Sequence, residues 1–429
     1  MSKFYLFFLL LAMLSVNISV KAQDVELYSK RVKELSSEKM YGRSKFMDGS
    51  KKAAQYIIRE LQKNKGVSIE KQEFSYPMNV MRGDLKFSAD GELFTPVSEY
   101  IVREFSSAKK GKFPVVYLEE KYYDPALFFE YMQSGEFKNK FVVMDFKRFM
   151  GKLDDRDISG VEVYNKYFEK MDNVGGIILM YREVPKFFKA RAHYTVPFPV
   201  VCVGPRFTKD VKEIEISLDT EFFPKHDAEN LFGTIKGESS DKCYMFVAHY
   251  DHLEMMGRDN VYLGANDNAS GVSFLLTMAD YFSQPENKPK YDVVLFFADG
   301  EEGNLLGSKY AAEHPLRPLS EIDFLFNIDM MADNGENLCV EISEVALDDL
   351  ALMRTINKEN NIFKEIERHP LSDNSDHFYF AIRGVPCMYY TFYGDYFKYY
   401  HTPSDTYDNF TTHHFQNLFD IIIKFMDLR

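Results

Sequence analysis

Histidine and carboxylate side chains follow three apolar runs of this chain, and these residue types are common metal ligands. His249 and Asp251 end the run YMFVAHYD, the pair Glu301 and Glu302 follows DVVLFFADG, and Asp329 follows FLFNI. Apolar runs of this length are typical of buried strands. When such strands are parallel, their carboxyl ends meet at one edge of the sheet, where α/β proteins place ligands. We therefore expect these side chains to converge.

Two loops complete the set of candidate ligands. The loop GANDNASG supplies Asp267, and the turn YHTPSD near the C-terminus supplies His401. Two histidines and three carboxylates suit two cations, with Asp267 shared between them. The mixture favours zinc, because calcium and magnesium prefer oxygen ligands alone. Glu301 and Glu302 are adjacent and point in different directions, so one can bind metal while the other acts as a base.

The elements that must position these residues follow an α/β pattern after residue 225. Continuous apolar runs alternate with stretches of helical periodicity, which predicts a mostly parallel, mixed central sheet with helices on both faces. The expected strands are LFGTIKG, YMFVAHYD, DVVLFFADG, FLFNIDM and VPCMYYTF. The expected helices cover 270–283, 304–313, 346–360, 375–383 and 411–428, the last beginning at a threonine cap.

The leading segment has the same kind of alternation. Residues 24–37 and 48–65 have helical periodicity, and residues 67–80 alternate as a strand that we expect to end at Pro77. The residue types in this segment do not suggest chemistry.

Residues 84–222 differ in composition from the rest of the chain. They are rich in Phe, Tyr and Lys and contain the short apolar runs FPVVYL, FVVMDF, GGIILMY and FPVVCVG. No ligand-like cluster of His, Asp and Glu occurs in this part of the sequence. We expect a small β-rich α+β domain inserted at 84–222 into a main domain made of residues 23–83 and 223–429.

Charge and the first residues limit the classes of function. A net charge of −13 argues against a general nucleic-acid binder, which should be basic. Residues 1–22 resemble a signal peptide, because Lys3 precedes an apolar stretch and Val20-Lys21-Ala22 fits a cleavage site before Gln23. We expect an exported protein, periplasmic or secreted, with no stable membrane insertion after cleavage.

The cysteines do not suggest a metal site. Cys202, Cys243, Cys339 and Cys387 lie in or beside apolar runs and lack CxxC spacing. We expect free, buried thiols, although export would permit a disulfide.

Five motifs in this order resemble the co-catalytic zinc aminopeptidase family: HYDH, GANDNASG, FFADGEEGNLLGS, FNIDM and YHTPSDT. The family includes secreted bacterial leucine-type aminopeptidases, glutamate carboxypeptidase and the non-enzymatic transferrin receptor. The likeness also covers MYGR and DGSKKAAQYIIREL near the front, and GGIILMY and VPFPVVCVG resemble the closing strands of a protease-associated domain. It implies a phosphorylase/hydrolase-like zinc exopeptidase fold with a protease-associated-like insertion.

The resemblance implies a ligand set for two zinc ions. His249, Asp267 and Asp329 would bind one ion, while Asp267, Glu302 and His401 would bind the other. No ligand of the family pattern is missing from this sequence.

The resemblance also implies roles for residues beside the ligands. Glu301 would be the general base, and Tyr400 would donate a hydrogen bond to the oxyanion of the tetrahedral intermediate. Asp251 would orient the imidazole of His249, and Asp405 is a weaker candidate for the same task at His401.

Three features depart from the family pattern or lack an assigned role. Asp299 precedes the glutamate pair where a small or apolar residue is expected, and His252 occupies a position often held by serine. The stretch SDNSDHFYF, which contains His377, resembles a substrate-facing part of the family.

The leading functional hypothesis is an aminopeptidase that removes N-terminal residues from peptide substrates. A glutaminyl-peptide cyclotransferase shares the fold and typically uses one zinc ion, and a non-catalytic binding protein on this fold would lack ligands. A carboxypeptidase would need an arginine cluster that the sequence does not locate. The preferred N-terminal residue and the oligomeric state stay open at this point.

Overall fold

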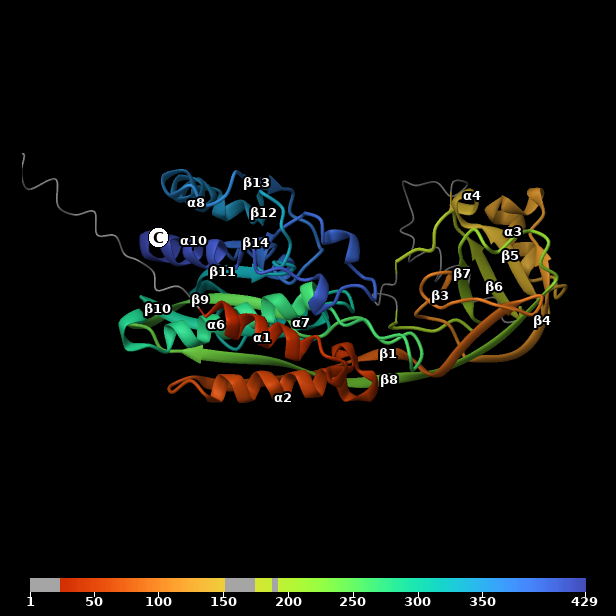
Figure 1. Ribbon diagram of the computed structural model, residues 1–429, viewed down its shortest axis with the longest axis horizontal. Helices are drawn as coiled ribbons and strands as arrows, with labels where there is room; N and C mark the ends of the chain where they lie inside the picture. Colours follow the sequence, from red (N-terminus) through yellow and green to blue (C-terminus); the bar gives the residue numbers. More distant parts are fainter. Residues whose placement is uncertain (1–23, 151–173, 187–191) are drawn as a thin grey trace, which may run out of the picture.

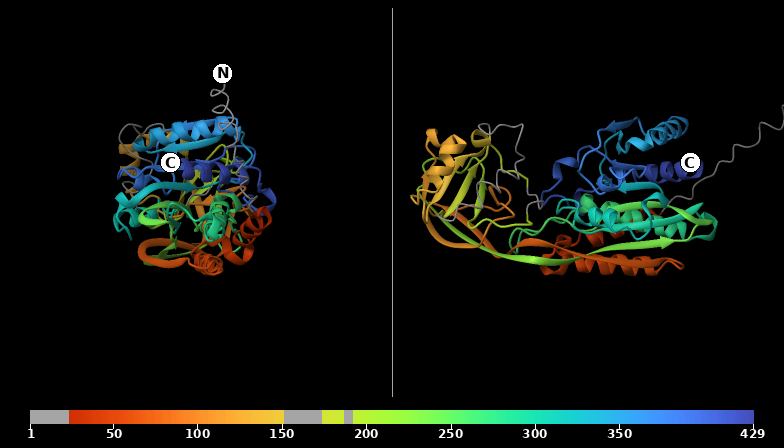
Figure 2. Two further views of the ribbon diagram at one scale, coloured as in Figure 1. Left: turned by 90° about the vertical axis from the view of Figure 1, so that its left-hand side faces the viewer. Right: turned by 180° about the vertical axis from the view of Figure 1, so that it is seen from behind.

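A computed structural model describes residues 24–150, 174–186 and 192–429, so the predicted signal peptide lies outside the described residues. The chain forms a larger and a smaller part at opposite ends of an elongated molecule (Figure 1). Two long strands, β1 (Ser68–Ala89) and β8 (Glu213–Ile235), pair antiparallel and connect the two parts along one side (Figure 2). No helix among the described residues is long and apolar enough to span a membrane.

The larger part contains a central sheet whose middle strands are parallel. They are β14 (Cys387–Thr391), β11 (Ile322–Ile328), β9 (Ser239–His249) and β10 (Tyr291–Ala298), in that spatial order. On one side β8 runs antiparallel to β10, and on the other β12 (Leu338–Ile342) runs antiparallel to β14. The last strand, β13 (Ile366–His369), is parallel to β12. The predicted mixed, mostly parallel sheet is confirmed.

Alternate residues of the middle strands pack into different cores. Phe246 belongs to the cluster beneath the helices on one face, while Met245 and Val247 belong to the cluster on the other face. The first face carries α1 (Val25–Leu35), α2 (Gly49–Gln62), α6 (Gly271–Phe282), α8 (Leu347–Asn360) and α10 (Phe415–Leu428). The second face carries α7 (Leu306–Glu313) and α9 (Phe378–Ala381). Helices therefore cover both faces, as predicted.

Two predicted helices are shorter than expected. The helix predicted at 375–383 is only Phe378–Ala381, because serine and asparagine residues before it form hydrogen bonds to other elements instead of a helical turn. The C-terminal helix begins at Phe415, and its N-cap is His414 rather than a threonine.

The prediction that a strand ends at Pro77 is wrong. Strand β1 continues to Ala89, and its register with β8 shifts between Tyr76 and Met78. A proline cannot donate a hydrogen bond to its neighbour, so the strand passes it at an irregularity and then resumes pairing.

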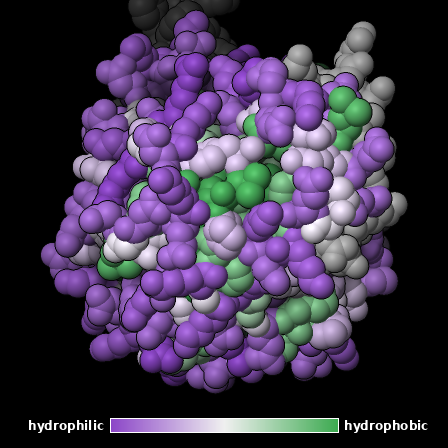
Figure 3. All heavy atoms as spheres, turned by 90° about the vertical axis from the view of Figure 1, so that its right-hand side faces the viewer, coloured by the Kyte–Doolittle hydropathy of each residue, from purple (hydrophilic) through white to green (hydrophobic). Residues whose placement is uncertain are grey.

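The smaller part has its own sheet and core. Its strands are β3 (Tyr100–Val102), β4 (Lys109–Tyr117), β5 (Phe141–Asp145), β6 (Gly176–Met180) and β7 (Val200–Val203), accompanied by α3 (Pro125–Met132) and α4 (Phe146–Met150). The four apolar runs predicted as strands correspond to β4, β5, β6 and β7. The predicted domain limits at 84 and 222 fall inside β1 and β8, which continue into both parts. The far end of this part is mostly hydrophilic with small apolar areas (Figure 3).

All four cysteines are buried and free, as predicted. No disulfide joins them, so the fold relies on its cores.

Candidate metal centre

The predicted ligands at the strand ends lie at one edge of the central sheet. His249 is the last residue of β9, Asp329 follows β11 directly, and the Glu301–Glu302 pair follows β10 after Asp299 and Gly300. These three strands are parallel neighbours, so their carboxyl ends coincide. The structure thus brings together the residues whose convergence the sequence predicts.

The loop that carries Asp267 has an unusual local conformation. Residues Ala265–Ser270 form an irregular π-helical turn before α6, and the peptide between Asp267 and Asn268 is cis. The turn begins at Gly264, which has a positive φ of 60°. A Cβ at that position would lie 2.1 Å from the main-chain oxygen of Asp267, so only glycine fits.

The first donor cluster contains His249, Asp267 and Asp329. The Nε2 atom of His249 lies 3.2 Å from Oδ1 of Asp267 and 3.4 Å from Oδ1 of Asp329. All three residues are buried.

The second donor cluster uses the other oxygen of the same aspartate. The Nε2 atom of His401 lies 3.2 Å from Oδ2 of Asp267 and 3.2 Å from Oε2 of Glu302. Asp267 therefore stands between two histidine–carboxylate pairs and directs one oxygen toward each. His401 reaches this point from the loop after β14.

The donor set fits zinc. Ligands at about 2.0–2.1 Å from a tetrahedral ion are about 3.3 Å apart, which is close to the distances within both clusters. Two carboxylate oxygens facing the centre, Asp267 Oδ2 and Asp329 Oδ1, are buried and accept no hydrogen bond from the described residues. Buried carboxylate oxygens normally have a partner, so their position favours a bound cation.

The pKa shifts of the cluster residues also favour a bound cation. Burial opposes charge on His401, but Glu302 and Asp267 raise the pKa of its imidazole to about 9. Burial likewise opposes charge on Glu302, whereas His401 and His252 lower the pKa of its carboxyl to about 2. The centre therefore attracts positive charge, and a metal ion would replace the protons on the imidazoles.

Glu301 and Tyr400 border the clusters at a small pocket. The Oε2 atom of Glu301 is 3.9 Å from His249 Nε2, and burial with nearby Glu302 and Asp329 raises the pKa of its carboxyl well above the usual value against the opposing effect of His249. Tyr400 stacks on the ring of His401 at 3.8 Å between centroids. The pocket has a volume of about 120 Å³. Besides Glu301 and Tyr400, it is lined by the cluster residues His249, Asp267, Asp329 and His401 and by Met330, Asn374, Tyr389, Tyr393 and Phe397.

The two aspartates predicted to orient histidines make different main contacts. His249 Nδ1 is 3.1 Å from the main-chain oxygen of Asp251 and 3.8 Å from its carboxylate. That carboxylate accepts a 3.0 Å hydrogen bond from the main-chain N–H of Glu301. The carboxylate of Asp405 accepts hydrogen bonds from the N–H groups of Asn266 and Asp267, at 2.8 and 3.0 Å. Asp251 thus contacts both His249 and Glu301, whereas Asp405 holds the loop of Asp267.

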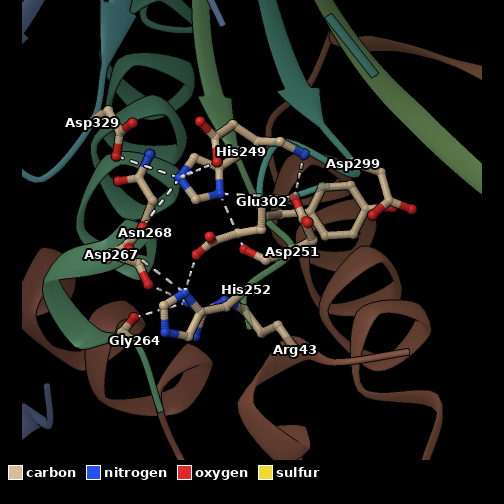
Figure 4. A network of polar contacts seen from close by, with 12 residues as sticks. Arg43, His249, Asp251, His252, Gly264, Asp267, Asn268, Asp299, Glu302 and Asp329 are labelled. Atoms are coloured by element: carbon tan, nitrogen blue, oxygen red, sulfur yellow. Dashed lines mark hydrogen bonds and ion pairs between the residues drawn. The ribbon is translucent and has the colours of Figure 1, made fainter. Parts of the chain in front are cut away.

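His252, which had no assigned role, lies against the second cluster. Its Nδ1 atom is 2.7 Å from Oε1 of Glu302 (Figure 4). His401 faces the other oxygen of that carboxylate. The Nδ1 atom of His252 is also 3.7 Å from Oδ2 of Asp267. His252 therefore fixes the orientation of Glu302. His377, also considered from the sequence, instead lies 3.5 Å from Glu341 and stacks on Tyr389.

The sequence did not indicate a role for two positively charged side chains of the leading segment. The guanidinium of Arg43 is fully buried and donates to the main-chain oxygens of Leu263, Gly264 and Asp267, at 2.7, 2.8 and 2.9 Å. Lys45 forms a buried ion pair with Asp299, which accounts for the unexpected carboxylate before the glutamate pair. The leading segment therefore anchors the Asp267 loop through Arg43, a structural contact that its residue types did not indicate.

Ser375 is a further residue that sequence reasoning did not single out. Its hydroxyl donates a 2.7 Å hydrogen bond to Oδ2 of Asp329 and accepts one of 2.8 Å from Asn327. This contact leaves Oδ1 of Asp329 directed at His249. The only signal in the sequence was the position of Ser375 within SDNSDHFYF.

The smaller part of the chain also reaches this centre. The Nζ atom of Lys186 lies 5.1 Å from the centroid of the Tyr400 ring, and Nε2 of His193 lies 2.6 Å from the main-chain oxygen of Gly303. Gly303 follows the glutamate pair directly, so the inserted region contacts Tyr400 at the pocket and the main chain beside the glutamate pair.

Comparison with known proteins finds a family match. Residues 230–426, which carry every candidate ligand, match peptidase family M28. The match confirms the resemblance to co-catalytic zinc aminopeptidases and supports a metal-dependent peptidase.

Solved M28-type structures have the same overall fold. A zinc aminopeptidase from Bacillus subtilis superposes with a TM-score of 0.70 at 19% identity, over 93% of this chain and 94% of that one. The aminopeptidase from Aneurinibacillus sp. strain AM-1 gives a TM-score of 0.68 at 17% identity, over 94% and 93%.

The curated relatives share a shorter stretch. The vacuolar membrane protease of Ajellomyces dermatitidis is 31% identical over 145 residues, which are 34% of this chain and 13% of that protein. The vacuolar membrane protease of Arthroderma otae is 37% identical over 91 residues, 21% of this chain and 9% of that protein. The chain thus spans a small fraction of the length of these relatives.

Proposed function

We propose that this M28 domain is a two-zinc aminopeptidase that hydrolyses the N-terminal residue from peptides. The observation that carries the proposal is the position of Asp267, whose Oδ1 faces His249 and whose Oδ2 faces His401. One carboxylate between two histidine–carboxylate pairs is the arrangement that two ions with a shared ligand require.

The ligands divide as the sequence suggests. His249 and Asp329 would hold one zinc ion, Glu302 and His401 the other, and Asp267 both. Zinc at these positions would supply Lewis acidity toward the peptide carbonyl and would lower the pKa of a water molecule in the site. Arg43, His252 and Ser375 keep the ligands in place through the hydrogen bonds described above.

Glu301 is the proposed general base. It belongs to neither donor cluster, yet its carboxylate borders the pocket 3.9 Å from His249 Nε2. The raised pKa of this carboxyl suits a group that accepts a proton from the attacking water and passes it to the leaving amine. The bond from the Glu301 N–H to the carboxylate of Asp251 fixes the main chain beneath it.

Tyr400 is the proposed oxyanion donor. Burial, with further effects of Asp267 and Glu302, raises the pKa of its phenol far above the usual value, so the hydroxyl stays protonated and can donate. Its ring stacks on His401, which keeps the side chain at the pocket wall. A donor there would stabilise negative charge that develops on the carbonyl oxygen during hydrolysis.

The pocket supports a substrate with an apolar first residue. Its volume of about 120 Å³ admits a single side chain, and Met330, Tyr389, Tyr393 and Phe397 form an apolar wall. The carboxylates of Glu301 and Asp329 also line the pocket and can hold a free α-amine. The combination favours exopeptidase over endopeptidase activity.

Two matched peptides test this proposal. A peptide with a free N-terminal Leu or Phe should release that residue, while its N-acetylated form should be stable. A chelator should stop the release, and zinc should restore it with two ions bound per catalytic centre. Cleavage of the acetylated peptide would contradict the proposed aminopeptidase. Cyclisation of N-terminal Gln without peptide hydrolysis would indicate a cyclotransferase instead.

A further inference from the structure

A second group of potential metal ligands lies at the outer edge of the central sheet. Strand β13 is the last strand and pairs only with β12. In the parallel register Cys339 is opposite Glu367, and Glu341 is opposite His369. Alternate residues of a strand share a face, so Cys339, Glu367 and His369 point to the same side of the sheet.

The three donor atoms are close together. Oε2 of Glu367 lies 3.8 Å from Sγ of Cys339 and 3.8 Å from Nε2 of His369. The donor atoms of the three residues all lie within 4.8 Å of one another. A tetrahedral ion with a thiolate at about 2.3 Å and oxygen or nitrogen at about 2.1 Å needs separations of about 3.4–3.6 Å. The two separations from Oε2 of Glu367 exceed this range by a few tenths of an ångström, and the side chains of Glu367 and His369 are 41% and 39% exposed, so they have room to move.

The surroundings of Glu367 leave one oxygen directed at the thiol and the imidazole. The side-chain amide of Asn337 donates to Oε1, and no Lys or Arg forms an ion pair with this carboxylate in the described part of the chain. Oε2 of Glu367 therefore faces Cys339 and His369, while Lys364 interacts with this carboxylate only beyond ion-pair distance.

The mixture of donors selects the kind of ion. Thiolate, imidazole and carboxylate together suit zinc and similar transition metals, whereas calcium and magnesium prefer oxygen ligands. Three protein donors leave a fourth position for water from the exposed side. Burial and Glu367 raise the pKa of the Cys339 thiol to about 11, so binding must displace a proton.

We propose that Cys339, Glu367 and His369 form a binding site for one zinc-like divalent cation, separate from the catalytic pair. The ion would cross-link β13 to β12 and thereby secure the last strand of the sheet. His369 packs at 5.9 Å from the ring of Tyr393, which lines the catalytic pocket. A cation bound at the edge site would therefore also stabilise one wall of that pocket.

Cobalt is the probe that separates this site from the catalytic centre. The catalytic ligands provide only nitrogen and oxygen, so a near-ultraviolet thiolate-to-cobalt charge-transfer band can arise only from a cysteine ligand. The chelator-treated, reduced full chain should develop this band when Co²⁺ is added, and Cys339→Ser should abolish it. Glu367→Gln and His369→Gln should each weaken Co²⁺ binding by tenfold or more, measured from the same band.

The exposed neighbour Glu365 supplies the matched control, and Glu365→Gln should bind Co²⁺ like the unaltered protein. Because Glu367 and His369 are partly exposed, their variants should fold normally, which circular dichroism can verify. The proposal is wrong if no thiolate band forms in the folded protein, or if the band survives in Cys339→Ser.

Discussion

The guanidinium of Arg43 donates a 2.9 Å hydrogen bond to the main-chain oxygen of Asp267, although 224 positions separate the two residues. The same guanidinium also binds the oxygens of Leu263 and Gly264. The Arg43 side chain of the leading segment therefore holds the loop that carries Asp267, the proposed shared ligand. In the proposed two-zinc centre, the position of the shared ligand Asp267 depends on this distant contact.

Replacement of Arg43 by Met should weaken zinc binding. The variant loses the hydrogen bonds that fix the Asp267 loop, and loss of such supporting contacts typically costs about 10–100-fold in metal affinity. Competition with a zinc-binding dye measures the affinity.

Arg31 provides the matched control for that variant. It is also a buried arginine, but it pairs with Glu60 and Asp280 away from the centre. Arg31→Met should lower stability and leave zinc affinity unchanged. Equal loss of zinc affinity in both variants would show that general destabilisation, rather than the contact with Asp267, is responsible.

Replacement of Lys45 by Met should destabilise the fold. Both side chains of the Lys45–Asp299 pair are 2% exposed, so the variant leaves a carboxylate buried without its partner. Breaking such a pair costs about 3–5 kcal/mol, measurable by urea unfolding. The double variant with Asp299→Leu should recover much of this loss. Failure of the second change to recover stability would argue against an unpaired charge as the cause.

Replacement of Ser375 by Ala should reduce zinc affinity without loss of fold. The hydroxyl of Ser375 holds Oδ2 of Asp329 at 2.7 Å, so its removal frees that ligand to rotate. We expect a decrease of about tenfold or more, measured by zinc competition at equilibrium. Ser273 is equally buried on α6, and Ser273→Ala should bind zinc normally. Unchanged zinc affinity in Ser375→Ala would show that Ser375 does not support zinc binding.

Removal of the ions should lower the melting temperature. The buried carboxylates Asp267, Glu302 and Asp329 then repel one another without a cation between them. Zinc at a thousandfold excess over its Kd should restore about 4 kcal/mol per site. A thermal shift assay with stepwise addition of zinc measures this effect, and a melting temperature independent of zinc would contradict it.

The sequence predicted the strands and the convergence of the candidate ligands because their signals are local. Each of His249, Glu302 and Asp329 follows a continuous apolar run, and the edge that these runs share follows from parallel pairing. His401 does not follow an apolar run directly, so its assignment as a candidate ligand depended on the motif alone.

Contacts that join distant parts of the chain could not be predicted in this way. Arg43 and Lys45 look like ordinary charged residues near a helix. No local sequence pattern indicates that both side chains are buried in contact with residues between 264 and 299. The course of β1 past Pro77 also depended on pairing with β8, a partner about 140 residues away. Tertiary pairing decided these features, so periodicity alone was insufficient.

Activity and zinc content of Glu301→Gln test the central claim most directly. Glutamine keeps the shape of the side chain but cannot accept the proton of the attacking water, so the rate of peptide hydrolysis should fall at least about a hundredfold. Because Glu301 belongs to neither donor cluster, the variant should retain both zinc ions, whereas Glu302→Gln should lose zinc as well as activity. Hydrolysis at the normal rate by Glu301→Gln would contradict the account.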